Sequence, residues 1–516
     1  MTMGVHGIHW HRNQTFWPMV KAYHDYIARC GQAQRQGVSV ADILYLTPEG
    51  APHIFMAPED ALTNKPGDRI RDKKGHPFDA VSPRILLERA QVKEGWVSFE
   101  SGSAYRVLVL PLVETMTPEL LAKIEQLVKD GATVIGVPPR KSPSLVGFPQ
   151  VDQAVMEKAR ALWGALETPV ALQEQPLGQG RILWGGDITT PGSGDKLYPS
   201  YASTHAWLEQ AGLPEVLSSD AGLRFHQRRT EDLDLFFVAN TSGQPVQCEA
   251  TFRTDGSHPE LWNAIDGSIR PLPGHAPADN GTLRMPLQFA AHEGYVVVFD
   301  RKATGAAAAV APDVPASKAV QEISGPWQVR FDPIWGGPEQ PVTFPTLTDW
   351  SNHEQPGIQY YSGIAVYETL FDAPSVDAAL HLDLGRVEDV ARVTLNGRDL
   401  GVVWSRPYRV AIPPGLLRER GNQLKIEVAN TWHNRLVGDQ QPGNKDVRKL
   451  QWENGLLAGR SYAAGRYTFA TRDLPKENST LQSSGLLGPV ALTPMNMQKL
   501  ESEGLDALDS PAHHPQ

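Results

Sequence analysis

The hydrophobic pattern near the start of the chain predicts one amphipathic helix. Between Pro18 and Gln36 a stripe of apolar side chains recurs at spacings of three and four residues: Val20, Tyr23, Ile27 and Cys30. Before it, Val5–Trp10 has the alternation of a strand. The expected unit is a strand followed by a helix with one buried face.

The pattern changes over residues 40–221, where short continuous apolar runs alternate with helical stripes. Tyr105–Pro111 and Thr133–Pro139 are such runs, and between them Thr117 can cap a helix that begins at Pro118. A strand, a helix and a strand in this order predict a parallel pair with a right-handed crossover. With a further run at Ala41–Leu46, residues 40–221 are predicted to form an open α/β domain, similar to flavodoxin or amidotransferase domains.

Short alternating strands follow, and they predict two all-β domains. Residues 222–301 read as a small antiparallel β-sandwich, with strands at Asp234–Thr241, Gln247–Arg253, Thr282–Phe289 and Gly294–Asp300. Residues 302–318 are rich in Ala and Pro and predict a linker. Residues 319–496, with a hairpin signal at Asn396–Gly397, predict a larger sandwich of jelly-roll type. Residues 497–516 are expected to be a disordered tail.

Composition narrows the functional classes. The 516 residues include 46 Gly and 42 Pro, which favours many turns, and the net charge of −10 leaves no basic surface for nucleic acid. The two cysteines, Cys30 and Cys248, cannot form a disulfide framework or a structural zinc site. No apolar run approaches the roughly 20 residues of a membrane span.

Residues 40–215 lack the motifs that usually give an open α/β domain its chemistry. They contain no glycine-rich dinucleotide or phosphate loop and no G-x-S-x-G elbow. Cys30 and Cys248 both fall outside this stretch, which argues against a cysteine-dependent amidotransferase. The α/β domain is therefore expected to be structural.

Three histidines, His6, His9 and His11, form the densest polar group in the sequence. On a strand, residues 9 and 11 share a face and could ligate a transition metal. The alternative is that one lines a sugar pocket and another is a hydrogen-bonded core histidine. Without a second group of ligands we assign no metal to them.

The residues that follow, Arg12, Asn13, Thr15 and Trp17, have two interpretations. An apolar indole face beside bidentate polar donors is typical of a rim that binds a polyol. Alternatively, Thr15 caps the helix and Trp17 packs against it.

A glycosidase needs two carboxylates, one as acid and the other as base or nucleophile. No pair of acidic residues lies in an evident barrel context, and neither Asp25 nor Asp42, the nearest to the histidines, receives a catalytic role. Aromatic residues in the last domain could stack on sugar rings or form its core: Trp327, Trp335, Trp350, Tyr360, Tyr361, Trp404 and Trp432.

Several long segments resemble the C-terminal half of glycoside hydrolase family 106, the α-L-rhamnosidases. The resemblance covers nearly the whole chain, and the last domain is also similar to the galactose-binding-type jelly roll of family 2-like glycosidases. The segments are Gly7–Trp17, Tyr26–Leu46, Tyr105–Pro111, Gly131–Leu145, Pro259–Gly267, Leu347–Glu368, Val393–Val410, Asn430–Asp439 and Ser483–Val490.

The resemblance also implies which part of the enzyme this chain is, which mechanism the enzyme uses and which residues border the sugar. Residues 1–39 would be the C-terminal remnant of a catalytic (β/α)8 barrel, most of which would lie upstream together with the catalytic carboxylates. The implied mechanism is inverting and calcium-dependent, with no ligands assignable here. His9, Arg12, Thr15 and Trp17 would border the sugar, and His11 stands where the family usually has Asn or Asp.

We therefore expect the C-terminal portion of an enzyme that hydrolyses terminal α-L-rhamnosides in rhamnose-containing glycans. The chain alone would be inactive unless a barrel is supplied. The rival hypothesis is a non-catalytic carbohydrate-binding or scaffold protein. The resemblance leaves the compartment open; it would be periplasmic or extracellular if an upstream part carries a signal peptide.

Overall fold

The computed structural model describes residues 10, 12–50, 55–63, 71–192, 197–303, 320–373, 380–442 and 475–494. The predicted tail and most of the predicted linker lie outside these ranges. The chain forms two compact units, one of Met1–Asp25 with Asp313–Gln516 and the other of Tyr26–Pro312. Helix α1 (Lys21–Gln34) carries the chain from the first unit into the second.

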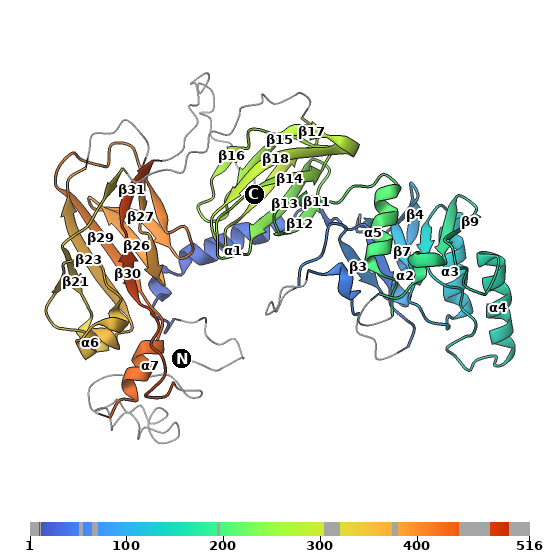
Figure 1. Ribbon diagram of the computed structural model, residues 1–516, viewed down its shortest axis with the longest axis horizontal. Helices are drawn as coiled ribbons and strands as arrows, with labels where there is room; N and C mark the ends of the chain where they lie inside the picture. The colour runs from blue at the N-terminus through green and yellow to red at the C-terminus, as the bar shows by residue number, and fades with distance from the viewer. Residues whose placement is uncertain are drawn as a thin grey trace, which may run out of the picture. The chain divides into compact units, whose positions relative to one another are not determined.

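The second unit contains a largely parallel sheet (Figure 1). Neighbouring strands run parallel except for the last, which is antiparallel to β10. The predicted parallel pair is confirmed, since β7 and β8 are hydrogen-bonded neighbours. The order is β3 (Phe78–Val81), β2 (Ile43–Leu46), β7 (Val107–Val109), β8 (Thr133–Ile135), β10 (Gly180–Trp184) and β9 (Gln173–Leu177).

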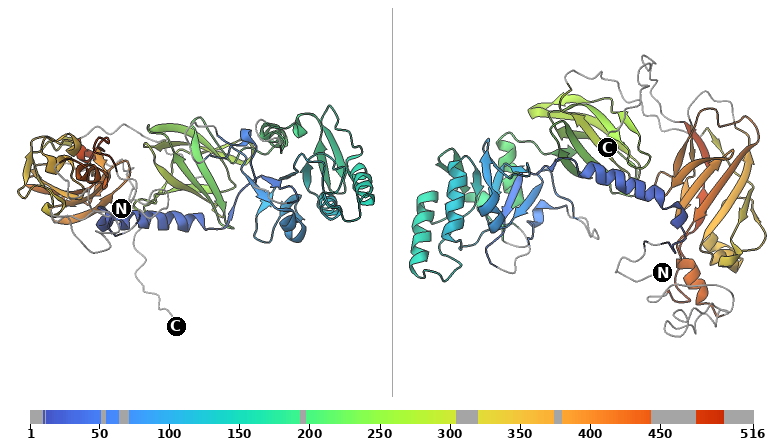
Figure 2. Two further views of the ribbon diagram at one scale, coloured as in Figure 1. Left: turned by 90° about the horizontal axis from the view of Figure 1, so that it is seen from below. Right: turned by 180° about the vertical axis from the view of Figure 1, so that it is seen from behind.

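Helices cover both faces of this sheet (Figure 2), and for this reason its central strands are apolar throughout. On one face lie α2 (Pro83–Arg89), α3 (Pro118–Lys129) and α4 (Gln150–Trp163), and on the other lies α5 (Tyr201–Gln210). The predicted cap is confirmed, because the Thr117 hydroxyl accepts a hydrogen bond from the Leu120 amide. A small sheet joins β4 (Gln91–Lys93), β5 (Trp96–Ser98) and β6 (Ala104–Tyr105).

Two antiparallel sheets follow in the same unit and enclose a core that includes Phe236, Phe252 and Phe299. One sheet has the order β1 (Val38–Ser39), β12 (Leu223–Arg229), β13 (Leu233–Asn240), β19 (Gly294–Asp300), β15 (Ser257–Trp262) and β16 (Ile269–Pro271). The other has the order β11 (Leu217–Ser219), β14 (Val246–Arg253), β18 (Thr282–Phe289) and β17 (Ala276–Ala278). The alternating patterns predicted four of these strands, β13, β14, β18 and β19, to within about one residue, and they did not predict the other six.

Helix α1 departs from its prediction. Of the expected stripe, Ile27 is 47% exposed, and only Ala33 of the helix is buried. Ala33 packs on Leu235, Val296 and Val298 of the sandwich. The periodicity located the helix correctly, but the prediction of one continuous buried stripe is wrong for the part of the chain that the structure describes.

The first unit holds antiparallel sheets around one aromatic-rich core. The predicted hairpin is confirmed: Asn396 and Gly397 both have positive φ, as a two-residue turn between twisted strands requires. The larger sheet has the order β22 (Val342–Phe344), β21 (Trp327–Arg330), β23 (Ile364–Phe371), β29 (Asn422–Ala429), β26 (Val390–Leu395) and β27 (Arg398–Val403). The smaller sheets are β20 (Gln321–Glu322), β31 (Ala491–Pro494), β24 (Leu380–Asp383) and β28 (Arg409–Ile412), and the pair β25 (Arg386–Glu388) with β30 (Gly485–Gly488). Short helices α6 (Pro356–Gln359) and α7 (His433–Asp439) complete it.

A buried carboxylate anchors the sandwich of the second unit. Asp234 is fully buried and accepts two hydrogen bonds from the Arg229 guanidinium, at 2.6 and 3.0 Å. Gln227 and Thr254 also donate to it. The buried charge of Asp234 is compensated by these donors, and removing either member of its ion pair with Arg229 would leave an uncompensated charge.

Replacing Asp234 with Ala is therefore expected to lower the free energy of unfolding by about 3–5 kcal/mol, because Arg229 would be left without its counter-ion. Asp255→Ala is the control: its side chain is 75% exposed and 3.5 Å from Arg301, so its loss should cost less than about 1 kcal/mol. Urea denaturation followed by fluorescence measures both. Equal effects would contradict this account of Asp234.

Candidate functional site

The residues predicted to border a sugar lie in the segment before α1. His9 lies outside the described residues, as do His6 and His11. Arg12 is exposed, Thr15 is buried at 8% exposure, and Trp17 is half-buried in a short 3₁₀ turn, η2 (Trp17–Met19). Arg12, Thr15 and Trp17 therefore lie in one short segment of the first unit.

Hydrogen bonds fix this segment onto the C-terminal sheets of the same unit. The Thr15 hydroxyl donates to the carbonyl of Asn430. The Trp432 indole donates to the carbonyl of Asn13 at 2.8 Å, and the Arg392 guanidinium donates to the carbonyl of Pro18 at 2.7 Å. Thr15 therefore has a structural partner, and it does not cap α1.

Aromatic rings pack around the same segment. Trp10 contacts Phe16 and Tyr23, with ring centroids 5.3 and 4.8 Å apart, and its indole donates to Nε2 of His24. Trp17 meets His24 edge-on. Trp10 is nevertheless 44% exposed, so part of its indole ring is open to a ligand; nothing in the sequence pattern distinguished this residue from its neighbours.

Asn430 lies at the centre of a buried polar network and is 2% exposed. Its side-chain oxygen accepts from the amide of Gly363, and its side-chain nitrogen donates to the carbonyl of Tyr361 and to the hydroxyl of Ser484. Asn434 also donates to Ser484. Because every one of these groups is buried, each partner lost would leave an unsatisfied polar atom.

Two adjacent carboxylates, Glu388 and Asp389, lie at the end of β25 and beside Thr431. Burial, together with the charge of Glu388, raises the pKa of Asp389 to about 6, although the Thr431 amide opposes this shift. Glu388 is paired with Arg386 at 2.9 Å. The only sequence signal for this pair was two consecutive acidic residues in a strand-like segment.

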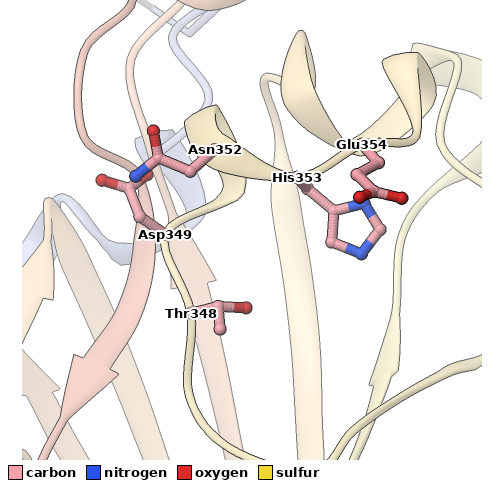
Figure 3. Close-up of a pocket in the computed structure, with 5 residues that line it drawn as sticks. All are labelled: Thr348, Asp349, Asn352, His353 and Glu354. Carbon is pink, nitrogen blue, oxygen red and sulfur yellow. The ribbon is translucent and has the colours of Figure 1, made fainter.

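A pocket of 370 Å³ lies in the first unit and is lined by Thr348, Asp349, Asn352, His353 and Glu354 (Figure 3). Asp349 does not offer a free carboxylate there, because it accepts hydrogen bonds from Ser351, Ser483 and Ser484. Burial alone would raise its pKa, but these donors hold the pKa below its usual value. Asp349 therefore stays ionised and is unsuited to be a general acid.

The aromatic residues of the C-terminal domain belong mainly to its core. Trp327, Trp350 and Tyr361 are buried to within 1%. The other four are half-buried: Trp335, Tyr360, Trp404 and Trp432. None of the seven is exposed, which favours packing over sugar stacking for this set.

Comparison with known proteins identifies the family. The family model described as alpha-L-rhamnosidase, glycoside hydrolase family 106, matches residues 1–275 of the 516. The chain belongs to this family.

Two relatives show how far the similarity extends. The rhamnosidase from Novosphingobium sp. PP1Y superposes with a TM-score of 0.75 at 28% identity, covering 93% of this chain and 41% of that one. A protein of Formosa agariphila with the name "Putative beta-glucuronidase" is 31% identical over 303 residues, which are 58% of this chain and 22% of that protein. The chain thus spans less than half the length of either relative.

Among the described residues, no helix is long and apolar enough to cross a membrane. The described residues do bring together three side chains that could hold a metal: His76, His205 and Glu209. Two imidazoles and one carboxylate are not the oxygen-rich set that calcium prefers, so this cluster does not fit the calcium that the resemblance implies.

The raised pKa of Asp389 predicts a pH-dependent stability. The folded state favours the protonated carboxyl, so this contribution is full below about pH 4 and is lost as the pH rises through about 6. Asp389→Asn stays neutral, and it should have a higher Tm than the parent at about pH 8, with the difference disappearing near about pH 4. Thermal unfolding across this range measures the effect.

Glu339→Gln, at an exposed position of the same unit, serves as the matched carboxylate-to-amide control and should show no such trend. A Tm difference for Asp389→Asn that does not change with pH would show that the carboxyl is not held protonated.

Proposed function

We propose that the chain is the C-terminal portion of a glycoside hydrolase that removes terminal α-L-rhamnose from glycans. The observation that carries this is the match over 93% of the chain, with a TM-score of 0.75, to 41% of a rhamnosidase. The complete enzyme would act by inversion, with one carboxylic acid and one carboxylate on opposite sides of the sugar.

The two catalytic carboxylates are proposed to come from outside this portion. Inverting enzymes hold their carboxyl groups about 6.5–9.5 Å apart to admit a water molecule. Glu388 and Asp389 share a side-chain hydrogen bond, so they are too close together. Asp349 is held ionised by its donors. Neither group meets the requirement, which supports an upstream barrel as the source of the pair.

The role of this portion would then be to hold one wall of the sugar site. The C-terminal domain, proposed to be a galactose-binding-like jelly roll, binds the segment of residues 12–18 through Arg392, Asn430 and Trp432. Arg12, Thr15 and Trp17, together with His9, would border the sugar. Ile27 on α1 is an exposed apolar side chain, which supports the proposal that a part of the complete enzyme outside these residues packs on this helix. Calcium is proposed from the family resemblance alone, and no ligand among the described residues is assigned to it.

The experiment compares two polypeptides: the 516-residue chain and the product of the whole open reading frame that contains it. Each is incubated with an aryl α-L-rhamnoside and calcium. We expect turnover only from a product that includes a barrel, with the β-anomer of rhamnose formed first and detected by NMR. Turnover by the 516-residue chain alone would contradict the proposed origin of the carboxylates.

Arg12→Ala in the active polypeptide should lower kcat/KM about tenfold or more, mainly by raising KM, since a charge-assisted hydrogen bond to the sugar is lost. Lys21→Ala is the control, because the Lys21 side chain is 84% exposed and its one ion pair among the described residues is with Asp25. No turnover by either polypeptide, combined with measurable rhamnose binding, would favour the non-catalytic scaffold instead.

A further inference from the structure

A second polar cluster, in the Tyr26–Pro312 unit, has no role in the proposed hydrolysis and shares no residue with the segment around Thr15. It consists of His76, His205 and Glu209, whose potential ligand atoms all lie within 4.8 Å of one another. His76 precedes β3, and the other two residues are on α5.

His76 is held in the orientation that a ligand needs. Its side chain is fully buried, and Nδ1 lies 2.8 Å from the carboxylate of Asp42. Asp42 is also paired with Arg253 at 2.7 Å, so it is an acceptor, and Nδ1 carries the proton. Nε2 then presents a lone pair, and it has no hydrogen-bond partner among the described residues. A carboxylate that orients a ligand histidine in this way is a common outer-shell partner in metal sites.

Helix α5 supplies the other two groups from one face. His205 and Glu209 are four residues apart, so they are neighbours on the helix surface, with Nε2 and Oε2 separated by 3.8 Å. Tyr201, one turn earlier, stacks on His205 and accepts a hydrogen bond from the backbone amide of His76 at 2.9 Å. This bond fixes the ligand-bearing face of α5 against the loop that carries His76.

The charges around the cluster favour a cation. Glu215 lies 3.9 Å from Nδ1 of His205, a nitrogen that also has no hydrogen-bond partner among the described residues. Two buried imidazole nitrogens without partners are costly, because each loses its hydrogen bond to water. A bound metal ion would coordinate Nε2 of His76 and Nε2 of His205, the nitrogen beside Glu209. Glu215, beside Nδ1 of His205, would add a second negative charge near the ion.

We propose that His76, His205 and Glu209 bind a divalent transition-metal ion of the Zn²⁺ class, with a water molecule as the fourth ligand. Imidazole and carboxylate ligands suit zinc, whereas calcium and magnesium require mostly oxygen. Zinc bond lengths of about 2.0–2.2 Å place neighbouring ligand atoms roughly 3.4 Å apart. The half-exposed His205 and exposed Glu209 can close the remaining distance by rotating, while Asp42 fixes His76.

The ion would join α5 to the loop before β3 and so stabilise the α/β part of the unit. This proposal does not depend on the proposed function, because it concerns neither the sugar nor the barrel. The test uses the full chain, stripped with a chelator and then titrated with zinc by calorimetry. Zinc binding is expected together with a Tm raised by several degrees.

His205→Gln and Glu209→Gln are the decisive variants, since both side chains are at least partly exposed and neither should unfold the protein. Each removes a ligand, so it should weaken zinc binding by more than the roughly tenfold to 100-fold that loss of an outer-shell partner costs, and it should remove the increase in Tm. Asp42→Asn should weaken zinc binding less, because His76 would stay in place as a ligand but lose the carboxylate that orients it; the variant also breaks the ion pair of Asp42 with Arg253. The triple variant His6→Gln, His9→Gln and His11→Gln controls for zinc held by the terminal histidines, and it should keep the increase in Tm.

Two results would overturn the site. One is a parent chain that shows no zinc-dependent rise in Tm. The other is a rise that survives in both His205→Gln and Glu209→Gln, which would place the zinc elsewhere; its loss in the terminal-histidine variant would place it at His6, His9 and His11.

Discussion

Asn430 is the residue on which the first unit depends most. Its backbone carbonyl accepts the Thr15 hydroxyl, and its side-chain amide bonds Tyr361, Gly363 and Ser484. Four stretches of chain therefore meet at one buried amide. Because a buried amide without its partners costs about 1–3 kcal/mol for each lost bond, these stretches are held in place together.

This constraint connects the fold to the proposed function. The segment that carries Arg12 and Trp17 has little core of its own in the described residues, and it takes its position from the sheets behind Asn430 and Trp432. A wall of a sugar site needs such support, since small displacements of binding groups are costly in catalysis. The β-rich C-terminal domain would act through this support, which does not require it to bind sugar itself.

The sequence was informative wherever local chemistry decides the structure. The helix after Thr117, the turn at Asn396–Gly397 and the strand at Thr282–Phe289 follow from capping, positive φ and alternation, all of which are local. The family could also be predicted, because its motifs are long and contiguous. The exposure of Ile27 could not be predicted, because periodicity shows that a helix has an apolar face but not which part of the protein covers that face.

The sites were harder to predict, because their partners are far apart in the chain. Thr15 and Asn430 are 415 residues apart, so the sequence left open whether Thr15 caps a helix or borders a sugar. His76 and His205 carry no motif, and they come together because α5 packs on the sheet whose edge strand is β3. Asp389 gained its raised pKa from burial, which adjacent acidic residues alone do not reveal.

Hydrogen–deuterium exchange on Thr15→Val tests the central claim most directly, since valine keeps the shape of threonine and removes only the donor to Asn430. The amides of Met19 and Val20, bonded to Phe16 and Trp17, should exchange faster, while those of β23 stay protected. Thr343→Val, which removes an exposed hydroxyl of the same unit, should leave all of them unchanged. Unaltered exchange at Met19 and Val20 in Thr15→Val would contradict the account, because the segment would then be held without Asn430.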